Sequence, residues 1–151
     1  MNNRYIFRGK RKSDGEWIYG ALDSEWALPP EERERYWISP AYLDDSFVIP
    51  ETIGQCTGLE DKNGKWIYEG DLLRFTNSDN EQSIYKVFYD DVYAGYRIQE
   101  IDLGGLDEMS NWENNREYFE VIGNIHDTPN LLKLEHDSLC ETETYKAGDT
   151  E

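Results

Sequence analysis

The sequence predicts a mainly β protein, a small barrel or roll of short strands and hairpins with one or two short helices attached. Tight-turn dipeptides alternate with short segments rich in β-branched and aromatic residues, the pattern of hairpin-linked strands. Trp, Tyr and Phe make up 14% of the 151 residues, which argues against a disordered chain. A chain of this length buries roughly 70% of its extended surface on folding, enough for a core without disulfides. We therefore expect a single β domain over residues 1–134 and a flexible polar tail over 135–151.

The first expected strand lies in a basic segment, residues 1–12, which has no acid and a charge of +5. Its bases are interleaved with Tyr5, Ile6 and Phe7, which favours an edge strand whose charges pair with the acidic body. A phosphate-binding arm is the alternative. The five bases are Arg4, Arg8, Lys10, Arg11 and Lys12.

A nine-residue segment then occurs twice, at residues 12–20 and again at 62–70. Each copy places Asp-Gly or Asn-Gly just before a Trp-Ile-Tyr strand, and its glycine is Gly15 or Gly64. These dipeptides supply the positive φ angles that a tight hairpin turn demands. We predict two hairpins of one design, which arose either by duplication or by convergence on good turn chemistry.

The elements downstream follow from shorter patterns. A polar loop is expected at 76–83, a turn at Asp90-Asp91, and a long acidic loop, rich in Gly and Asn, at 99–117. Strands are expected at residues 71–75, 84–89, 92–98 and 117–125.

Two short helices are expected. Residues 28–36 begin with two prolines followed by acids, which suits a helical first turn. Thr128 is a candidate N-cap, with Pro129 at the first helical position of a helix that extends to about His136.

The charge limits the classes of partner. Thirty-two acids against fifteen bases give a net charge of −17, which repels nucleic acid and anionic lipid and favours basic partners. The chain has no apolar run of 18 residues, and its start lacks the apolar stretch of a signal peptide. We expect a soluble, cytoplasmic protein without a membrane partner.

No motif points to a catalytic, cofactor or metal site. The candidate ligands His126, Asp127, Glu135 and His136 lack the helical spacing of three or four residues between histidines. Cys56 and Cys140 form no Cys-x-x-Cys pair and are expected to be free thiols.

Carboxylates are abundant in this chain. Glycosidase chemistry needs two carboxyl groups that flank a cleft, and a calcium loop at 77–81 lacks the Asp-x-Asp-x-Asp-Gly frame. We expect these acids to face water. The adjacent pairs are Asp44-Asp45, Asp90-Asp91 and Asp107-Glu108.

The aromatic residues of the two repeats alternate with isoleucine. Trp17 and Tyr19 share one strand face, opposite Ile18, and the second copy has Trp66, Ile67 and Tyr68 in the same order. One of the two faces must then be partly exposed or covered by a partner. We expect the aromatic face to be core or a subunit contact; stacking of bases or of a peptide is the alternative.

Two segments resemble the YopX family. Residues 52–73, TIGQCTGLEDKNGKWIYEGDLL, resemble its pattern T-x-G-Q-x-T-G-L-x-D-x-N-G-x-x-I-Y-E-G-D followed by two apolar residues. Residues 119–132, FEVIGNIHDTPNLL, resemble its closing motif, and Phe7-Arg8-Gly9-Lys10 fits its start. The resemblance covers residues 4–134, with Cys56 where many members carry an aromatic residue. It implies an origin in phages or prophages and an SH3-like barrel or roll, and it supplies no catalytic, cofactor or binding residue. The recurrent Thr57-Gly58, Asn63-Gly64 and Gly70-Asp71 are explained by turn chemistry.

The leading functional hypothesis is a non-enzymatic phage accessory protein that binds a host or phage protein and assembles with itself. One form of it is an acidic protein that occupies the basic groove of a nucleic-acid-binding protein, through acids such as Asp102, Asp107, Glu108 and Glu113. The alternative is a nucleic-acid-binding or nucleic-acid-mimicking regulator. An enzyme with an unfamiliar carboxylate site ranks last.

Overall fold

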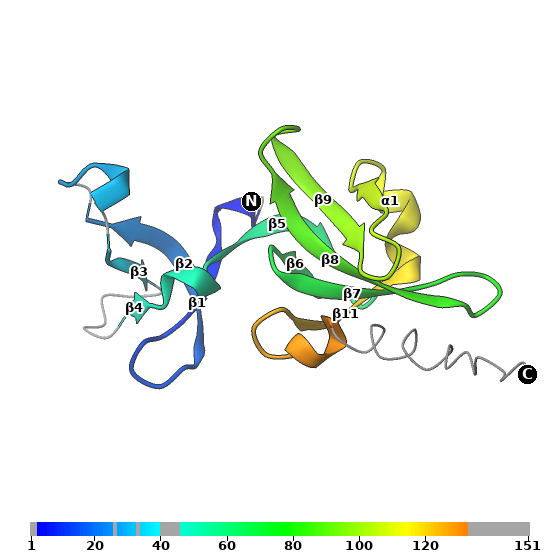
Figure 1. The fold of residues 1–151 in the computed structure, drawn as a ribbon, viewed down its shortest axis with the longest axis horizontal. Coiled ribbons are helices and arrows are strands. Elements are labelled where there is room, and N and C mark those ends of the chain that lie inside the picture. The colour runs from blue at the N-terminus through cyan, green and yellow to red at the C-terminus, as the bar shows by residue number, and fades with distance from the viewer. Residues whose placement is uncertain (1–2, 26, 33, 40–45, 133–151) are drawn as a thin grey trace, which may run out of the picture.

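The computed structural model describes residues 3–25, 27–32, 34–39 and 46–132. The strands form two antiparallel sheets that lie next to each other along the long axis of the molecule (Figure 1). Each sheet ends in two different edge strands, so neither closes on itself. The mainly β fold is therefore confirmed. Of the expected barrel or roll, the described residues do not form a closed barrel, because their strands make two open sheets.

The first sheet has six strands in the order β4-β3-β2-β1-β5-β6. The strand β1 lies between β2 and β5, so the prediction that the basic segment forms an edge strand is wrong. The bounds are β1 Phe7–Lys10, β2 Trp17–Ser24, β3 Tyr36–Ser39, β4 Phe47–Val48, β5 Gly54–Glu60 and β6 Trp66–Tyr68.

Both predicted hairpins are present in this sheet. The pairs β1–β2 and β5–β6 are antiparallel, and their turns contain Gly15 and Gly64 at φ angles of 74° and 77°. L side chains rarely adopt this backbone region, which explains why the two copies share a glycine there.

The second sheet has five strands in the order β10-β9-β8-β7-β11. The predicted strand over 92–98 starts later than expected, because residues 91–94 form the turn between β8 and β9. The predicted loop over 99–117 is also wrong in part, because it contains β10 and the short helix α1. The bounds are β7 Asp71–Thr76, β8 Gln82–Asp90, β9 Gly95–Glu100, β10 Leu106–Glu108, β11 Phe119–Asn124 and α1 Trp112–Asn115.

Where the two helices are predicted, the described residues form 3₁₀ turns, and residues 133–136 of the second helix lie outside the described ranges. Among the described residues of 28–36, the helical part is the 3₁₀ turn Pro30–Glu32, because β3 already begins at Tyr36. After Thr128 the described chain forms the 3₁₀ turn Pro129–Leu132. The remaining 3₁₀ turns are Asn3–Tyr5, Pro50–Thr52 and Arg116–Tyr118.

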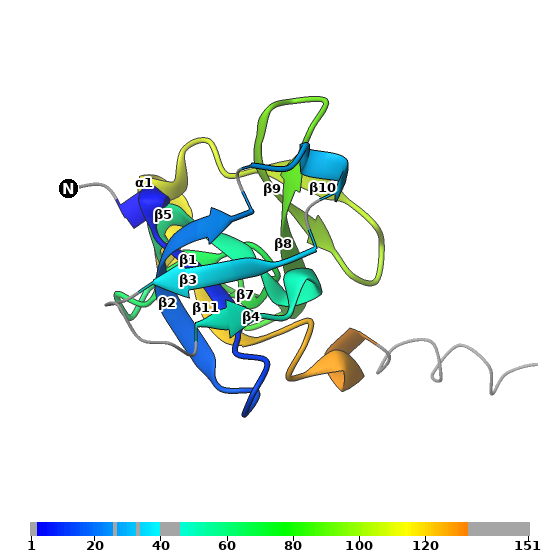
Figure 2. The same cartoon turned by 90° about the vertical axis from the view of Figure 1, so that its left-hand side faces the viewer.

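Two separate apolar clusters stabilise the sheets. The smaller one, in the first sheet, contains Ile18, Ile38 and Val48. The larger one lies over the second sheet and includes Ile67 and Trp112. The strand β5 connects the two regions, since it pairs with β1 at its start and with β6 farther along (Figures 1 and 2).

Several predictions concern residues outside the described ranges. These are the polar tail, the free thiol of Cys140, and the candidate ligands or carboxylates Asp44, Asp45, Glu135 and His136.

Candidate binding pocket between the two sheets

A pocket of about 380 Å³ opens where the two sheets meet. This volume lies within the range of small-ligand sites, roughly 300–1,000 Å³. Both hairpins of the repeat contribute to it, together with β7, β11 and the turn that follows β11. We call it the aromatic pocket, and it is lined by Arg8, Trp17, Tyr19, Lys65, Trp66, Tyr68, Asp71, Val121, Gly123, Asn124 and Asp127.

The alternation of the repeat explains the aromatic lining. Ile18 and Ile67 are buried in the two apolar clusters, so the aromatic residues on either side of each isoleucine face the other way. The aromatic faces of both hairpins thereby line one pocket, although their glycines are 49 positions apart in the chain. On the aromatic face, Tyr68 is only 8% exposed and belongs to the core, as expected. Tyr19 on the same face is 46% exposed, so this face is only partly buried.

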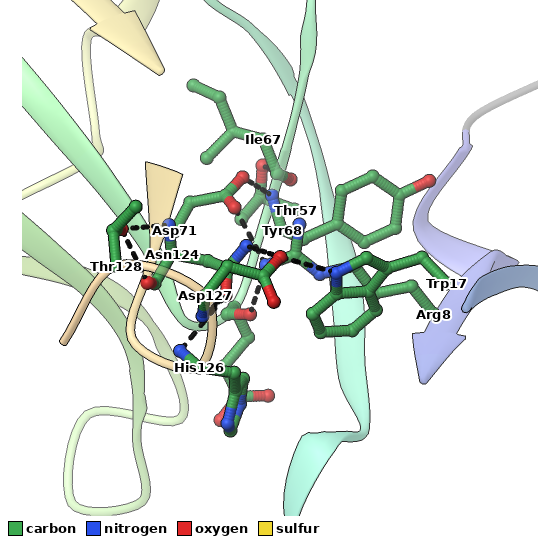
Figure 3. A network of polar contacts seen from close by, with 11 residues as sticks. Arg8, Trp17, Thr57, Ile67, Tyr68, Asp71, Asn124, His126, Asp127 and Thr128 are labelled. Carbon is green, nitrogen blue, oxygen red and sulfur yellow. Dashed lines mark hydrogen bonds and ion pairs between the residues drawn. The ribbon is translucent and has the colours of Figure 1, made fainter. Parts of the chain in front are cut away.

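A buried ion pair lies beside these rings. Arg8 Nη2 lies 2.7 Å from Asp71 Oδ1 and donates a hydrogen bond of 3.3 Å to the carbonyl oxygen of Glu69. The guanidinium carbon also lies 4.8 Å from the ring centroid of Trp17 and 4.9 Å from that of Tyr68, within cation–π range (Figure 3). Arg8 therefore occupies the space between two aromatic rings of its own pocket.

Burial shifts the pKa values of Asp71 and Tyr68. Burial raises the pKa of Asp71, although Arg8 opposes the shift. Burial also raises the pKa of Tyr68 to about 12, so its phenol stays protonated at neutral pH. Asp71 Oδ2 accepts a hydrogen bond of 2.8 Å from the Tyr68 backbone N–H, which holds β6 next to β7.

A second polar centre surrounds Asp127 at the rim. Its carboxylate pairs with Lys10. It also accepts hydrogen bonds from Trp17 Nε1 at 2.6 Å and from Asn124 Nδ2 at 3.0 Å (Figure 3). Burial acts to raise the pKa of Asp127, but the hydrogen bonds from Lys10, Asn124 and Trp17 outweigh it and lower the pKa to about 2. Asp127 is thus a fixed anion that joins β1 and β2 to the turn after β11.

His126 lies next to this centre. Its ring centroid is 5.9 Å from that of Trp17. Burial lowers the pKa of His126, and the positive charges of Arg8 and Lys10 lower it further. The described residues contain no group of three His, Cys, Asp or Glu side chains arranged to hold a metal ion.

Three bases of the basic segment, residues 1–12, form ion pairs with acidic residues, as expected. Arg8 contacts Asp71, Lys10 contacts Asp127, and Arg11 Nη1 lies 3.5 Å from Asp14 Oδ2. Because these three positive charges are already paired within the chain, they are not available to bind phosphate, which argues against the phosphate-binding alternative.

The other acidic candidates have structural roles or lie elsewhere. Asp90 pairs with Arg97, at 3.2 Å between Oδ2 and Nη1, and also accepts the Val92 backbone N–H. Asn77 Oδ1 accepts the backbone N–H groups of Asp79 and Glu81, an ordinary turn arrangement. Asp107 and Glu108 line a different pocket, under α1.

A family model described as YopX protein matches residues 6–133. The chain belongs to the YopX family. This YopX-family chain is also similar to a solved structure, described as the crystal structure of protein EF1440 from Enterococcus faecalis, with 25% sequence identity and a TM-score of 0.50. The similarity covers 83% of this chain and 96% of the other. No match was found among functionally curated proteins.

The aromatic residues of the pocket in this YopX-family chain are predicted from the sequence, but its ion pair is not. Gly70-Asp71 was explained as turn chemistry, and Gly70 does have a φ of 86°. Asp71 is also the counter-ion of Arg8, 63 positions away, and no local pattern connects the two residues. In the part of the chain that the structure describes, no helix is long and apolar enough to span a membrane.

Proposed function

We propose that this YopX-family chain is a non-enzymatic phage or prophage accessory protein that binds another protein in the cytoplasm, with side chains of the partner in the aromatic pocket. The observation that carries the proposal is the pairing of polar groups inside the pocket. Asp71 and Asp127 are both held by internal cations and donors. The surface offered to a ligand is shared about equally between polar and apolar atoms, and it combines the aromatic rings with charged groups that are already paired and with the exposed Lys65.

Aromatic surface of this kind suits a protein partner. Tyr and Trp are enriched among the residues that contribute most to protein–protein affinity, because they bury much area with few rotatable bonds. Tyr19 and Trp66 keep part of their surface exposed at the mouth of the pocket. The net charge of −17 favours a basic partner and accelerates its association at low salt.

The pKa shifts of Cys56 and Asp127 support the proposed lack of enzymatic activity. Cys56 is buried, and burial raises the pKa of its thiol, which disfavours a nucleophilic thiolate. Asp127, with a pKa of about 2, is a poor general base at neutral pH.

Self-assembly is the second part of the proposal. When no partner is bound, a second copy that covers the aromatic pocket would remove Tyr19 and Trp66 from water, so the partner and the second copy compete for this surface. Light scattering after gel filtration, over a tenfold range of concentration, should show a dimer or larger species that Tyr19→Ala/Trp66→Ala dissociates. A monomer at all concentrations would refute this part alone.

The main experiment is affinity capture of tagged protein from host lysate, with mass spectrometry and with or without nuclease. We expect a specific protein that remains after nuclease treatment and is lost with Tyr19→Ala/Trp66→Ala. The matched control is Tyr93→Ala, which removes a tyrosine that is 63% exposed and outside the pocket.

Two outcomes would contradict the proposal. Capture that disappears with nuclease, together with binding that strengthens as salt falls, would favour the nucleic-acid-binding alternative. Equal losses with the pocket variant and with Tyr93→Ala would show that the aromatic pocket does not select the partner.

A further inference from the structure

A second, smaller pocket lies over the second sheet, next to α1, and has a volume of about 220 Å³. This volume is below the usual range for a small-molecule site, so it suits one side chain better than a whole ligand. Its lining combines four aromatic residues, Phe75, Tyr85, Trp112 and Phe119, with the acidic residues Asp107 and Glu108 of β10.

The rings form one continuous cluster. The Phe119 centroid lies 4.8 Å from that of Trp112, 5.1 Å from Phe75 and 5.8 Å from Tyr85. Trp112 is also fixed in place, since its Nε1 donates a hydrogen bond of 2.7 Å to the carbonyl oxygen of Glu60. The aromatic wall is therefore built into the core and needs no rearrangement to receive a ligand.

The strand register explains why an acid lies beside these rings. Asp107 of β10 is paired with Ile98 of β9, which is paired with Val87 of β8. Residues that are directly paired across strands share a face of the sheet, so Asp107 lies on the same face as the buried Ile98 and Val87. Its carboxylate is exposed at the open edge of that face.

The charged residues that line this pocket are all acidic. No Lys or Arg is among the residues that line it, and the Arg116 Nη1 next to α1 lies 3.9 Å from Glu60 Oε2. Burial raises the pKa of the Tyr85 phenol, and the negative charges of Glu100 and Asp107 raise it further. An aromatic wall next to the Asp107 carboxylate attracts an organic cation through both cation–π and ionic interactions.

We propose that this acidic aromatic pocket binds the side chain of one Lys or Arg residue of a partner protein. The methylene stem lies along the aromatic rings, and the ammonium or guanidinium group lies between the rings and the carboxylate of Asp107. This site is separate from the aromatic pocket between the sheets, and it gives the chain a specific contact for a basic partner.

The test uses three short Gly-Ser peptides that each carry one central residue, Lys, Arg or the uncharged norleucine. They are titrated into the full-length protein at low salt and followed by two-dimensional NMR on the assigned Trp112 indole N–H. We expect saturable shifts with the Lys and Arg peptides, and none with norleucine. The dissociation constant should increase by about fivefold in Asp107→Asn, the weakening expected for loss of an exposed ion pair.

The control variant, Asp79→Asn, removes the same charge at an exposed position that does not line the pocket. It should leave the dissociation constant within about twofold of the unmodified protein, because distant surface charges are screened. Absence of saturable shifts, equal shifts with norleucine, or equal weakening by the two variants would overturn the proposal. None of these outcomes bears on capture through the aromatic pocket, since the titration uses no natural partner.

Discussion

Arg8 and Asp71 connect the two sheets through an ion pair of 2.7 Å, and their side chains are only 7% and 1% exposed. Arg8 belongs to β1 of the first sheet, and Asp71 begins β7 of the second. The pair thus lies where the two sheets meet, beside the rings of Trp17 and Tyr68. Burial of two opposite charges makes this contact sensitive to loss of either partner.

Removal of Arg8 alone should destabilise the protein strongly. Arg8→Met leaves the Asp71 carboxylate buried without its cation, which costs about 3–5 kcal/mol of unfolding free energy. Urea unfolding followed by tryptophan fluorescence measures this loss. The double variant Arg8→Met/Asp71→Asn should recover part of it, because the amide carries no charge and its oxygen still accepts the Tyr68 N–H. Additive losses in this double-mutant cycle would contradict the proposed coupling.

Asp127 should make the unfolding free energy depend on pH in the acid range. Its folded-state pKa of about 2 lies below the ordinary value of 3.8, so its contribution is complete above about pH 4 and is lost as the pH falls towards 2. The carboxylate is 39% exposed, so solvent screening reduces the contribution to on the order of 1 kcal/mol. Urea unfolding at several pH values should show a smaller difference between Asp127→Asn and the unmodified protein at pH 2 than at pH 6. Asp79→Asn, in an exposed loop, is the control, and a difference that is constant with pH would refute the assignment.

Asp61 should be essential to the second hairpin. Its Oδ1 accepts the backbone N–H groups of Asn63 and Lys65 at 2.8 and 2.9 Å, and its Oδ2 accepts that of Val121 at 3.0 Å. Asp61→Asn replaces one of these oxygens with an NH₂ group that faces a donor, so we expect a loss of about 1–3 kcal/mol in thermal or urea unfolding.

An exposed aspartate in the turn of the first hairpin serves as the control for Asp61. Asp14 in the first hairpin is exposed and accepts the Glu16 backbone N–H at 3.0 Å. Asp14→Asn should cost less than about 0.5 kcal/mol, as surface substitutions usually do. Similar losses for the two variants would show that burial of Asp61 has no special effect.

Gly123 should not tolerate a side chain. A Cβ at this position would lie 2.3 Å from Thr128 Oγ1, which accepts the Asn124 N–H and donates to the Asn124 carbonyl oxygen. Gly123→Ala should therefore lower the unfolding free energy by about 1–3 kcal/mol. Gly105→Ala, whose Cβ would find its nearest neighbour at 3.6 Å, should be close to neutral. If Gly123→Ala/Thr128→Ala is no more stable than Gly123→Ala, the clash is not the cause.

Short-range patterns account for the parts of the fold that were predicted correctly. The glycines of the two hairpin turns and the alternation of aromatic residues with isoleucine depend on conformations of neighbouring residues. The same reasoning placed β7, the centre of β8 and β11 close to their observed bounds. It failed at β1, because the number of neighbours of a strand depends on segments such as β5, more than forty positions away.

The segment between β9 and β11 shows a second kind of failure. Residues 106–108 are exposed and acidic, so nothing in their own pattern indicates a strand. They form β10 because β9 offers an open edge with which to pair. Trp112 likewise begins a helix of only four residues, which is stabilised by packing on Phe119 and not by intrinsic helix propensity.

The amino-acid sequence alone determines the family, the mainly β class, the two hairpin turns and the aromatic strand faces, because each depends on contiguous residues. The position of those faces in one pocket, and the pairing of Arg8 with Asp71, follow from the way the two sheets meet. Long-range contacts of this kind depend on packing and buried charge, which a local pattern does not encode. The acidic aromatic pocket has the same origin, because the register of β10 brings Asp107 to the face that carries Ile98.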